Sequence, residues 1–278
     1  MIRPLLHNIP KERNAELFPK RKIEKGDSVF HFINATNDCS VGTSIKVDER
    51  AIDPKGVDLN EMVKLHHTLS FMIIRNDSII YENYANKYTD TSVLSGFSVA
   101  KSFVSTLIGI AIDEGKIKSV RQPITDFIPE LTDKGFGKIT IKNLLNHTSG
   151  IRFSKQRYNP NSDNAQFYYT KNLRTKTLQS KIEEAPGLYF NYQSENYQLL
   201  GLIIERATHQ TLSNYLQEKI WKPLGMENNG FWNIDNSSNT GIEKAFCCLN
   251  ATTHDFAKLG RLFQDKGSWN GRQLISAK

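Results

Sequence analysis

The segment that decides the fold reads SVAKSFVSTLIGIAIDEG over residues 98–115, and a shorter apolar stretch, LSFMIIRNDSIIYE, precedes it at residues 69–82. In the shorter stretch the polar pair Asn76-Asp77 separates two strand-like runs, which predicts a β-hairpin. In the longer segment the apolar side chains recur at helical spacing, and a glycine follows them as a stop signal. Because the hairpin is too apolar to be stable alone, other elements must cover it.

Signals for further helices lie on both sides of this segment. Asp58 and Glu61 match a capping box that opens a short helix through His67. Residues 151–170 are predicted to form a long loop, of the kind that often serves as a lid. Strands that precede a run of helices indicate an α+β protein rather than alternating βαβ units. The other predicted helices are a turn capped by Thr140 over Ile141–Asn146, residues 170–184, 195–208 and 212–221, and a last helix opened by Thr252 and Asp255 that runs through Phe263.

The composition excludes several classes of protein. The chain has 278 residues, of which 38% are hydrophobic, enough to fill a core. Its net charge is +7, but the cations are dispersed among acids and are not interleaved with aromatic residues, so nucleic-acid binding is not expected. The longest apolar stretch, residues 104–112, is far shorter than the ~20 residues of a membrane span.

The cysteines form no recognisable framework. There are three, Cys39, Cys247 and Cys248, and the adjacent pair is expected to be poorly placed to form a disulfide. No spacing of cysteine and histidine fits a zinc site, so neither a metal nor a cofactor is predicted. The first ten residues lack the apolar core of a secretory signal. The location stays open: cytoplasmic, or periplasmic or extracellular if a leader was removed.

Ser98 and Lys101 are the first candidates for chemistry. Residues three apart on a helix share a face, so the Lys101 amine is expected beside the Ser98 hydroxyl. A serine hydroxyl needs an adjacent base to act as a nucleophile, and burial among apolar neighbours lowers the pKa of a lysine enough for it to serve. The N-terminus of the helix also offers backbone N–H groups to a developing oxyanion.

A second motif, PGLYFNYQSENYQLLG at residues 186–201, adds to this pair. Together with SVAK at 98–101, LLNHTSGI at 144–151, WNG at 269–271 and the hairpin, it resembles the serine β-lactamase and penicillin-binding protein superfamily. The resemblance extends over most of the chain and points to the branch of class C β-lactamases, esterases and 6-aminohexanoate-dimer hydrolases. It implies an antiparallel sheet with flanking helices plus a mostly helical subdomain.

The resemblance also implies roles for the site residues. Tyr192 matches the tyrosine of the family's Tyr-x-Asn motif, so Ser98 would attack a carbonyl while Lys101 and Tyr192 take its proton, and Tyr192 would then protonate the leaving group. Which of the two is the formal base stays open. The third motif position is Ser194 rather than Asn, and a hydroxyl there makes fewer hydrogen bonds to a substrate. This departure shifts the expectation from β-lactams towards esters or amides.

Four other residues are expected to be structural. His147 belongs to a His-Thr-Ser-Gly turn, which side-chain-to-backbone hydrogen bonds would hold, rather than to a Ser–His catalytic pair. Tyr189 and Tyr197 lie on either side of the motif tyrosine and are expected to pack. His254, on the last predicted helix, is expected to serve as a cap.

Three functions compete on this sequence. The first is an active serine hydrolase that acts through an acyl-enzyme on a small ester, amide or β-lactam. The second is a penicillin-binding or D-alanyl-D-alanine peptidase activity, and the third is a non-catalytic homologue that binds a peptide or another partner. The substrate and the oligomeric state are not readable from the sequence.

The resemblance suggests how the chain is divided. Residues 1–27 would form an extended arm, 28–97 the first part of an α/β subdomain, 98–245 the mostly helical subdomain with the catalytic residues, and 246–278 an incomplete return to the α/β subdomain. Members of the resembling family continue into further strands of the antiparallel sheet, one of which borders the substrate. We therefore expect this chain to be a fragment that lacks those strands.

Overall fold

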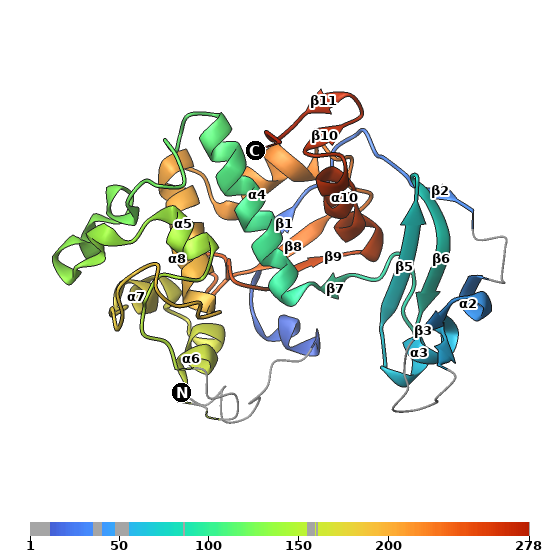
Figure 1. Cartoon of the computed structure of the whole chain (residues 1–278), viewed down its shortest axis with the longest axis horizontal. Coiled ribbons are helices and arrows are strands. Elements are labelled where there is room, and N and C mark those ends of the chain that lie inside the picture. The colour runs from blue at the N-terminus through green and yellow to red at the C-terminus, as the bar shows by residue number, and fades with distance from the viewer. Residues whose placement is uncertain are drawn as a thin grey trace.

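The computed structural model describes residues 12–35, 41–47, 56–85, 87–154, 159 and 161–277. Within them, mostly antiparallel sheets and a body of helices form the predicted α+β architecture. Figure 1 shows the hairpin sheet at one end of the molecule and the helical body at the other, with α4 and a second sheet between them.

The predicted hairpin is present in the first sheet. β5 (Ser70–Arg75) pairs antiparallel with β6 (Ser78–Tyr84), and β2 (Ile33–Asn34) pairs parallel with the other edge of β6. Asn76 and Asp77 have left-handed φ angles of 51° and 59°, which a two-residue turn of type I′ requires and which Asn and Asp tolerate well. Among the described residues, no strand pairs with the free edge of β5.

Helix α3 (Leu59–Leu65) covers part of this hairpin. Asp58 caps it by accepting a hydrogen bond from the backbone N–H of Glu61 at 2.9 Å, as the capping box predicts. Leu59 on its inner face joins Tyr81 of β6 in a small apolar cluster. The short elements α2 (Val41–Ser44), β3 (Lys46–Val47) and β4 (Val57–Asp58) lie beside it.

The second sheet is antiparallel, in the order β1-β8-β9-β7. β1 (Lys20–Ile23) lies in the segment predicted to be an arm, yet it pairs with β8 along its whole length and buries Ile23 completely. The N-terminal segment is therefore joined to strands far along the chain. The other strands are β8 (Gly230–Asn233), β9 (Leu249–Ala251) and β7 (Leu94–Ser95).

Helix α4 (Ala100–Asp113) is the centre of the main core. It packs against the second long helix, α8 (Ser194–Thr208), and side chains such as Phe103 and Leu107 are fully buried. Gly115 has a left-handed φ of 71°, which ends the helix. The remaining elements are η1 (Glu12–Leu17), η3 (Ile124–Asp126), η4 (Pro129–Lys134), η5 (Phe136–Lys138), α5 (Ile141–Leu145), α9 (Leu212–Leu216), the π-helical turn η6 (Gln217–Trp221), α10 (Thr253–Gln264), β10 (Ser268–Trp269) and β11 (Arg272–Gln273).

Two predicted segments differ from the structure. The stretch expected to be a long loop contains α6 (Asp163–Tyr169), which Ser162 caps and which buries Phe167 in the core. The helix expected over residues 170–184 is limited to α7 (Leu173–Leu178). Both helices are too short to show a clear 3.6-residue period, so tertiary packing rather than local pattern decides where they form.

The adjacent cysteines are joined by a disulfide, so the prediction that they do not pair is wrong. That prediction rested on the short Cα–Cα distance of neighbouring residues, which is 3.7 Å here. Cys248 has a left-handed φ of 71°, and the turn that contains it brings both side chains to the same side. Both residues are buried, and Cys39 lies outside the described residues.

His254 is not a helix cap, because Thr252 caps α10 by accepting from the Asp255 N–H. Instead, His254 Nε2 lies 2.6 Å from a Glu82 carboxylate oxygen on β6, and its Nδ1 lies 3.4 Å from Glu227. Hydrogen bonds to Glu227 and Glu82 raise the pKa of His254 to about 10. The imidazolium therefore ties the hairpin to α10 and to the loop before β8.

We expect the free energy of unfolding to fall as the pH rises from neutral to alkaline values. His254 keeps its proton up to about pH 10 in the folded chain but loses it near pH 6.5 when unfolded. Its contribution is therefore fully present below pH 6.5 and lost as the pH passes 10. In chemical denaturation, wild type should lose on the order of 2 kcal/mol more than His254→Gln across this window, which is less than the full linkage value because solvent screens this half-buried cluster. Equal losses would show that this imidazole is not charged in the fold.

Candidate active site

Ser98 lies in the turn that connects the second sheet to α4. The 3₁₀ turn η2 (Phe97–Val99) runs directly into α4 and leaves Ser98 exposed. Just before it, Gly96 donates its N–H to the Leu249 carbonyl of β9 at 2.9 Å, and a Cβ on Gly96 would come within 2.5 Å of the Phe256 ring. A glycine here therefore lets the serine turn pack closely on the sheet.

Lys101 lies one helical turn after Ser98, on the same face, as the spacing predicts. Its Nζ donates hydrogen bonds to Ser98 Oγ at 3.2 Å and to the Phe246 carbonyl at 2.5 Å. Only 7% of Lys101 is exposed. Burial lowers the pKa of this amine below its ordinary value, against an opposing effect of Tyr192. The amine is therefore suited to accept a proton from the serine hydroxyl.

Tyr192 completes a three-residue cluster. Its hydroxyl is hydrogen-bonded with both Ser98 and Lys101, and Lys101 Nζ lies 5.0 Å from the centre of its ring. Burial on its own would raise the pKa of Tyr192, but the hydrogen bond with Ser98 and the charge of Lys101 outweigh it and lower the pKa below its ordinary value. A phenol in this state can relay a proton, and its titration is shared with the lysine.

The turn around His147 holds the segment that carries Tyr192. The His147 carbonyl accepts from the Asn191 N–H at 2.7 Å, and His147 Nδ1 accepts from the Gln193 N–H at 3.3 Å. The buried imidazole lies 4.5 Å from the Tyr192 ring, measured between ring centres. His147 thus has the structural role expected of it, and that role is to position the tyrosine.

Ser194 and Tyr197 lie at the start of α8, near this cluster. The Ser194 hydroxyl contacts Asn164 Oδ1 at 3.3 Å, and no hydrogen bond within the described residues links it to the three clustered side chains. Tyr197 is buried, as expected, and its ring centre lies 5.7 Å from Lys101 Nζ. The structure thus brings together three of the four predicted site residues and leaves Ser194 at their border.

Tyr189 does not pack, contrary to the prediction. It is 64% exposed, and its neighbours Leu188 and Phe190 are 66% and 70% exposed. Gly187 before them has a left-handed φ of 92°, and the turn that it forms directs the next residues outwards. Leu188–Phe190 therefore make an apolar rim, defined by these three residues, next to the segment of Tyr192.

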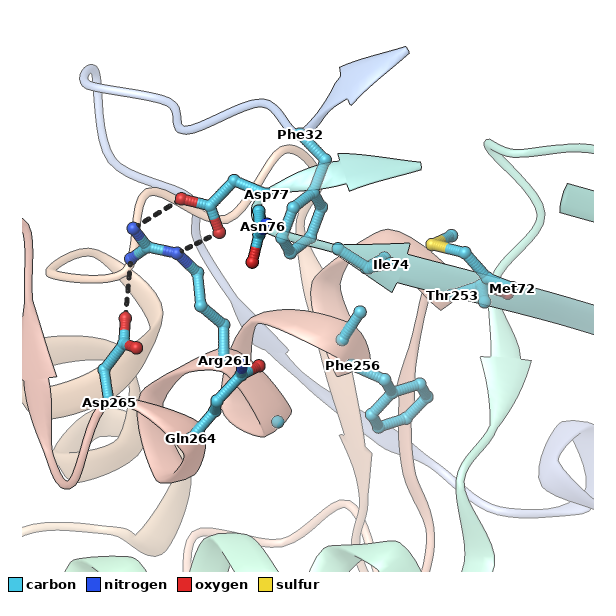
Figure 2. A pocket seen from close by; sticks show the side chains of 12 residues that line it. Phe32, Met72, Ile74, Asn76, Asp77, Thr253, Phe256, Arg261, Gln264 and Asp265 are labelled. Atoms are coloured by element: carbon cyan, nitrogen blue, oxygen red, sulfur yellow. Dashed lines mark hydrogen bonds and ion pairs between the residues drawn. The ribbon is translucent and has the colours of Figure 1, made fainter. Parts of the chain in front are cut away.

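A separate pocket of about 690 Å³ lies between β5 and α10, as Figure 2 shows. Met72, Ile74 and Phe256 supply its apolar part, and Arg261 borders it through two hydrogen bonds to Asp77, at 2.6 and 2.8 Å. None of the three clustered residues lines this pocket, so it is distinct from the candidate active site. In the described part of the chain, no group of His, Cys, Asp or Glu is arranged to hold a metal, and no helix is long and apolar enough to span a membrane.

A sequence model of the Beta-lactamase family matches residues 62–240, a range that includes the whole cluster. The chain belongs to this family. A 6-aminohexanoate-dimer hydrolase from Paenarthrobacter ureafaciens is 24% identical over 229 residues, which cover 79% of this chain and 57% of the hydrolase. A protein named "putative D-alanyl-D-alanine carboxypeptidase" from Salmonella agona (strain SL483) is 25% identical over 197 residues, which cover 62% of this chain and 45% of that protein.

Solved structures agree with this membership of the Beta-lactamase family. A structure described as a "putative 6-aminohexanoate-dimer hydrolase" from Bacillus anthracis superposes with a TM-score of 0.82 at 25% identity, covering 94% of this chain and 70% of the other. The chain spans about half the length of the curated relatives it matches. One of these relatives is named as a hydrolase and the other as a putative carboxypeptidase, which is also a class of hydrolase.

Proposed function

We propose that this chain belongs to a serine hydrolase that forms an acyl-enzyme at Ser98, with Lys101 and Tyr192 moving the protons. The observation that supports this most directly is the cluster itself. A buried amine lies 3.2 Å from an exposed serine hydroxyl, and a phenol is hydrogen-bonded with both. A nucleophile, a base and a proton relay within hydrogen-bond reach of one another are the requirements for acyl transfer.

The proposed proton movements use the three clustered residues. Ser98 Oγ attacks the substrate carbonyl, and its proton passes to the Lys101–Tyr192 pair. The N-terminal turn that leads into α4 favours the negative charge that develops on the carbonyl oxygen. Tyr192, which is 44% exposed and so accessible to a substrate, returns the proton to the leaving group. Water then releases the acyl group from the serine.

A small ester or amide with an apolar part is the substrate class that we favour. Ser194 stands where the family motif has an amide side chain, and its hydroxyl provides fewer hydrogen bonds for a β-lactam substrate. The apolar rim, Leu188–Phe190, lies next to the tyrosine segment and is largely exposed. An apolar acyl or leaving group would bury part of this rim and gain binding free energy from it.

A second candidate is an activity on D-alanyl-D-alanine peptides, which the similarity to the Salmonella protein favours. Both candidates use the same acyl-enzyme, so the cluster alone does not separate them. They differ in the lifetime of a penicilloyl adduct, because penicillin-binding proteins hydrolyse it slowly.

A panel of acyl donors tests the proposal. The chain is incubated with nitrocefin, a fluorescent penicillin, short-chain p-nitrophenyl esters, small amides and a fluorophosphonate, and both product release and intact mass are followed. Turnover of an ester or amide, with one acyl group added per chain, is expected. A long-lived penicillin adduct would favour the peptidase, and the absence of any adduct would contradict the proposal and favour a binding module.

Tyr192→Phe is expected to lower ester turnover at least ~10-fold, because the ring remains but the proton relay is lost. Steady-state kinetics on the best ester of the panel would measure it. Tyr88→Phe removes a hydroxyl from a tyrosine between β6 and β7 whose ring contacts Lys87 rather than the cluster, and it serves as the matched control. An unchanged rate in Tyr192→Phe would show that another group carries the proton.

A further inference from the structure

The residue that accepts the second hydrogen bond from Lys101 is followed directly by the disulfide. Phe246 supplies the carbonyl, and Cys247 and Cys248 are joined to each other across the next peptide bond. The two cysteines are 6% and 2% exposed, and β9 begins immediately after them. The disulfide thus begins one residue after a contact of the candidate base.

Hydrogen bonds fix the rest of this turn to β8. The Cys247 carbonyl accepts from Trp232 Nε1 at 2.9 Å, and the Cys248 carbonyl accepts from the Asn233 N–H at 3.0 Å. The Cys247 N–H in turn donates to the Lys244 carbonyl at 3.0 Å. The carbonyls of both cysteines are therefore bound to β8, whereas the Phe246 carbonyl accepts the hydrogen bond from Lys101.

We propose that the Cys247–Cys248 disulfide is a positioning pair that holds the Phe246 carbonyl on the Lys101 amine, and that its reduction slows acylation of Ser98. This inference rests on the proposed function. A ring closed across one peptide bond restricts the backbone on both sides of that bond, and Cys248 has a left-handed φ that non-glycine residues seldom adopt. Opening the ring allows the turn to relax and the Phe246 carbonyl to move.

The position of that carbonyl matters because a neutral amine has a single lone pair. When one N–H of Lys101 is donated to Phe246, rotation of the amine is restricted, and the lone pair can be held towards Ser98 Oγ. Without this acceptor the amine samples orientations that cannot take the serine proton. Within the described residues, the titratable groups that face Lys101 are Tyr192 and Tyr197, and no hydrogen bond or ion pair joins either of them to the disulfide.

The redox step balances with a dithiol as the reductant. A thiolate of the dithiol attacks one Sγ and breaks the S–S bond, and its second thiol then resolves the mixed disulfide. Two electrons pass from the dithiol to the cystine, which leaves two cysteine thiols and a cyclic disulfide. Reoxidation uses a disulfide such as oxidised glutathione, which is released as two thiols.

The test measures the acylation rate of Ser98 by a fluorophosphonate over a range of pH, in oxidised and dithiothreitol-reduced protein. Cys39→Ser is the background for every sample, so that the only cysteines are the pair. Alkylation and peptide mass report the state of the pair in each sample. Reduction should slow acylation about tenfold, and reoxidation should restore the rate. The rising limb of the pH profile should also move to lower pH, because the carbonyl acceptor that favours the charged amine is lost.

The double variant Cys247→Ser/Cys248→Ser tests the inference even if the buried disulfide resists the reductant, because it lacks the disulfide altogether. It should show the slow rate and the shifted profile without any reductant, and should not respond to dithiothreitol. Free thiols in the untreated protein, or equal rates and profiles for oxidised wild type and the double variant, would overturn the inference. If the inference about the disulfide fails in this way but oxidised wild type is still labelled at Ser98, the proposed function stands. If no donor labels the protein, both the proposed function and the inference about the disulfide are overturned.

Discussion

Ser98→Ala should abolish covalent labelling by every acyl donor that labels the wild-type chain. The hydroxyl lies 3.2 Å from the lysine amine, and removal of its oxygen leaves the amine and the phenol with no nucleophile to activate. Because Ser98 is exposed in the turn η2 and the buried Lys101 amine keeps its hydrogen bond to the Phe246 carbonyl, the fold should persist in the alanine variant. Intact mass after incubation with a fluorophosphonate measures the result directly.

Ser105→Ala is the matched control for this variant. Ser105 lies on the same helix, and its hydroxyl donates only to the Ser102 carbonyl at 2.9 Å. Its replacement should leave labelling unchanged. If Ser98→Ala is still acylated at the wild-type rate, and peptide mapping places the adduct on another side chain, the assignment of the nucleophile is wrong.

The parts of the fold that depend on neighbouring residues could be predicted from the sequence. The hairpin turn at Asn76-Asp77, the cap at Asp58 and the long helix from Ala100 are all local features, and the structure contains each of them. α6 could not be predicted, because its seven residues are held by burial of their aromatic side chains rather than by a periodic pattern. β1 could not be predicted either, because it is held by pairing with β8, which lies about 200 residues further along the chain.

The candidate site likewise has residues that a local sequence pattern predicts and residues that no local pattern predicts. Ser98 and Lys101 meet because residues three apart on a helix share a face, and this could be predicted. Tyr192 came only from a family resemblance, because its contact with them bridges two distant segments. The Phe246 carbonyl has no sequence signal, since any residue can supply a backbone acceptor. The disulfide was missed because adjacent cysteines seldom pair.

Lys101→Ala should lower the rate of acylation at least ~10²-fold, the scale of general acid–base catalysis. The amine is the one cationic group in contact with Ser98 among the described residues, and burial lowers its pKa so that the neutral form exists at lower pH than in a free lysine. The wild-type rate should therefore rise with pH through an apparent pKa that lies below the ordinary value of lysine and belongs to the Lys101–Tyr192 pair. Stopped-flow acylation by a p-nitrophenyl ester measures both quantities.

Lys101→Met separates the loss of the base from the loss of packing. Methionine fills most of the space of the buried lysine stem, so this variant should remain folded while acylation falls to the level of Lys101→Ala. Lys142→Met, at a surface lysine on α5, should keep the wild-type rate. If Lys101→Met kept that rate and the same pH profile, the lysine would have no part in the proton transfer. Tyr192, which is hydrogen-bonded with the same serine, would then have to act as the base alone.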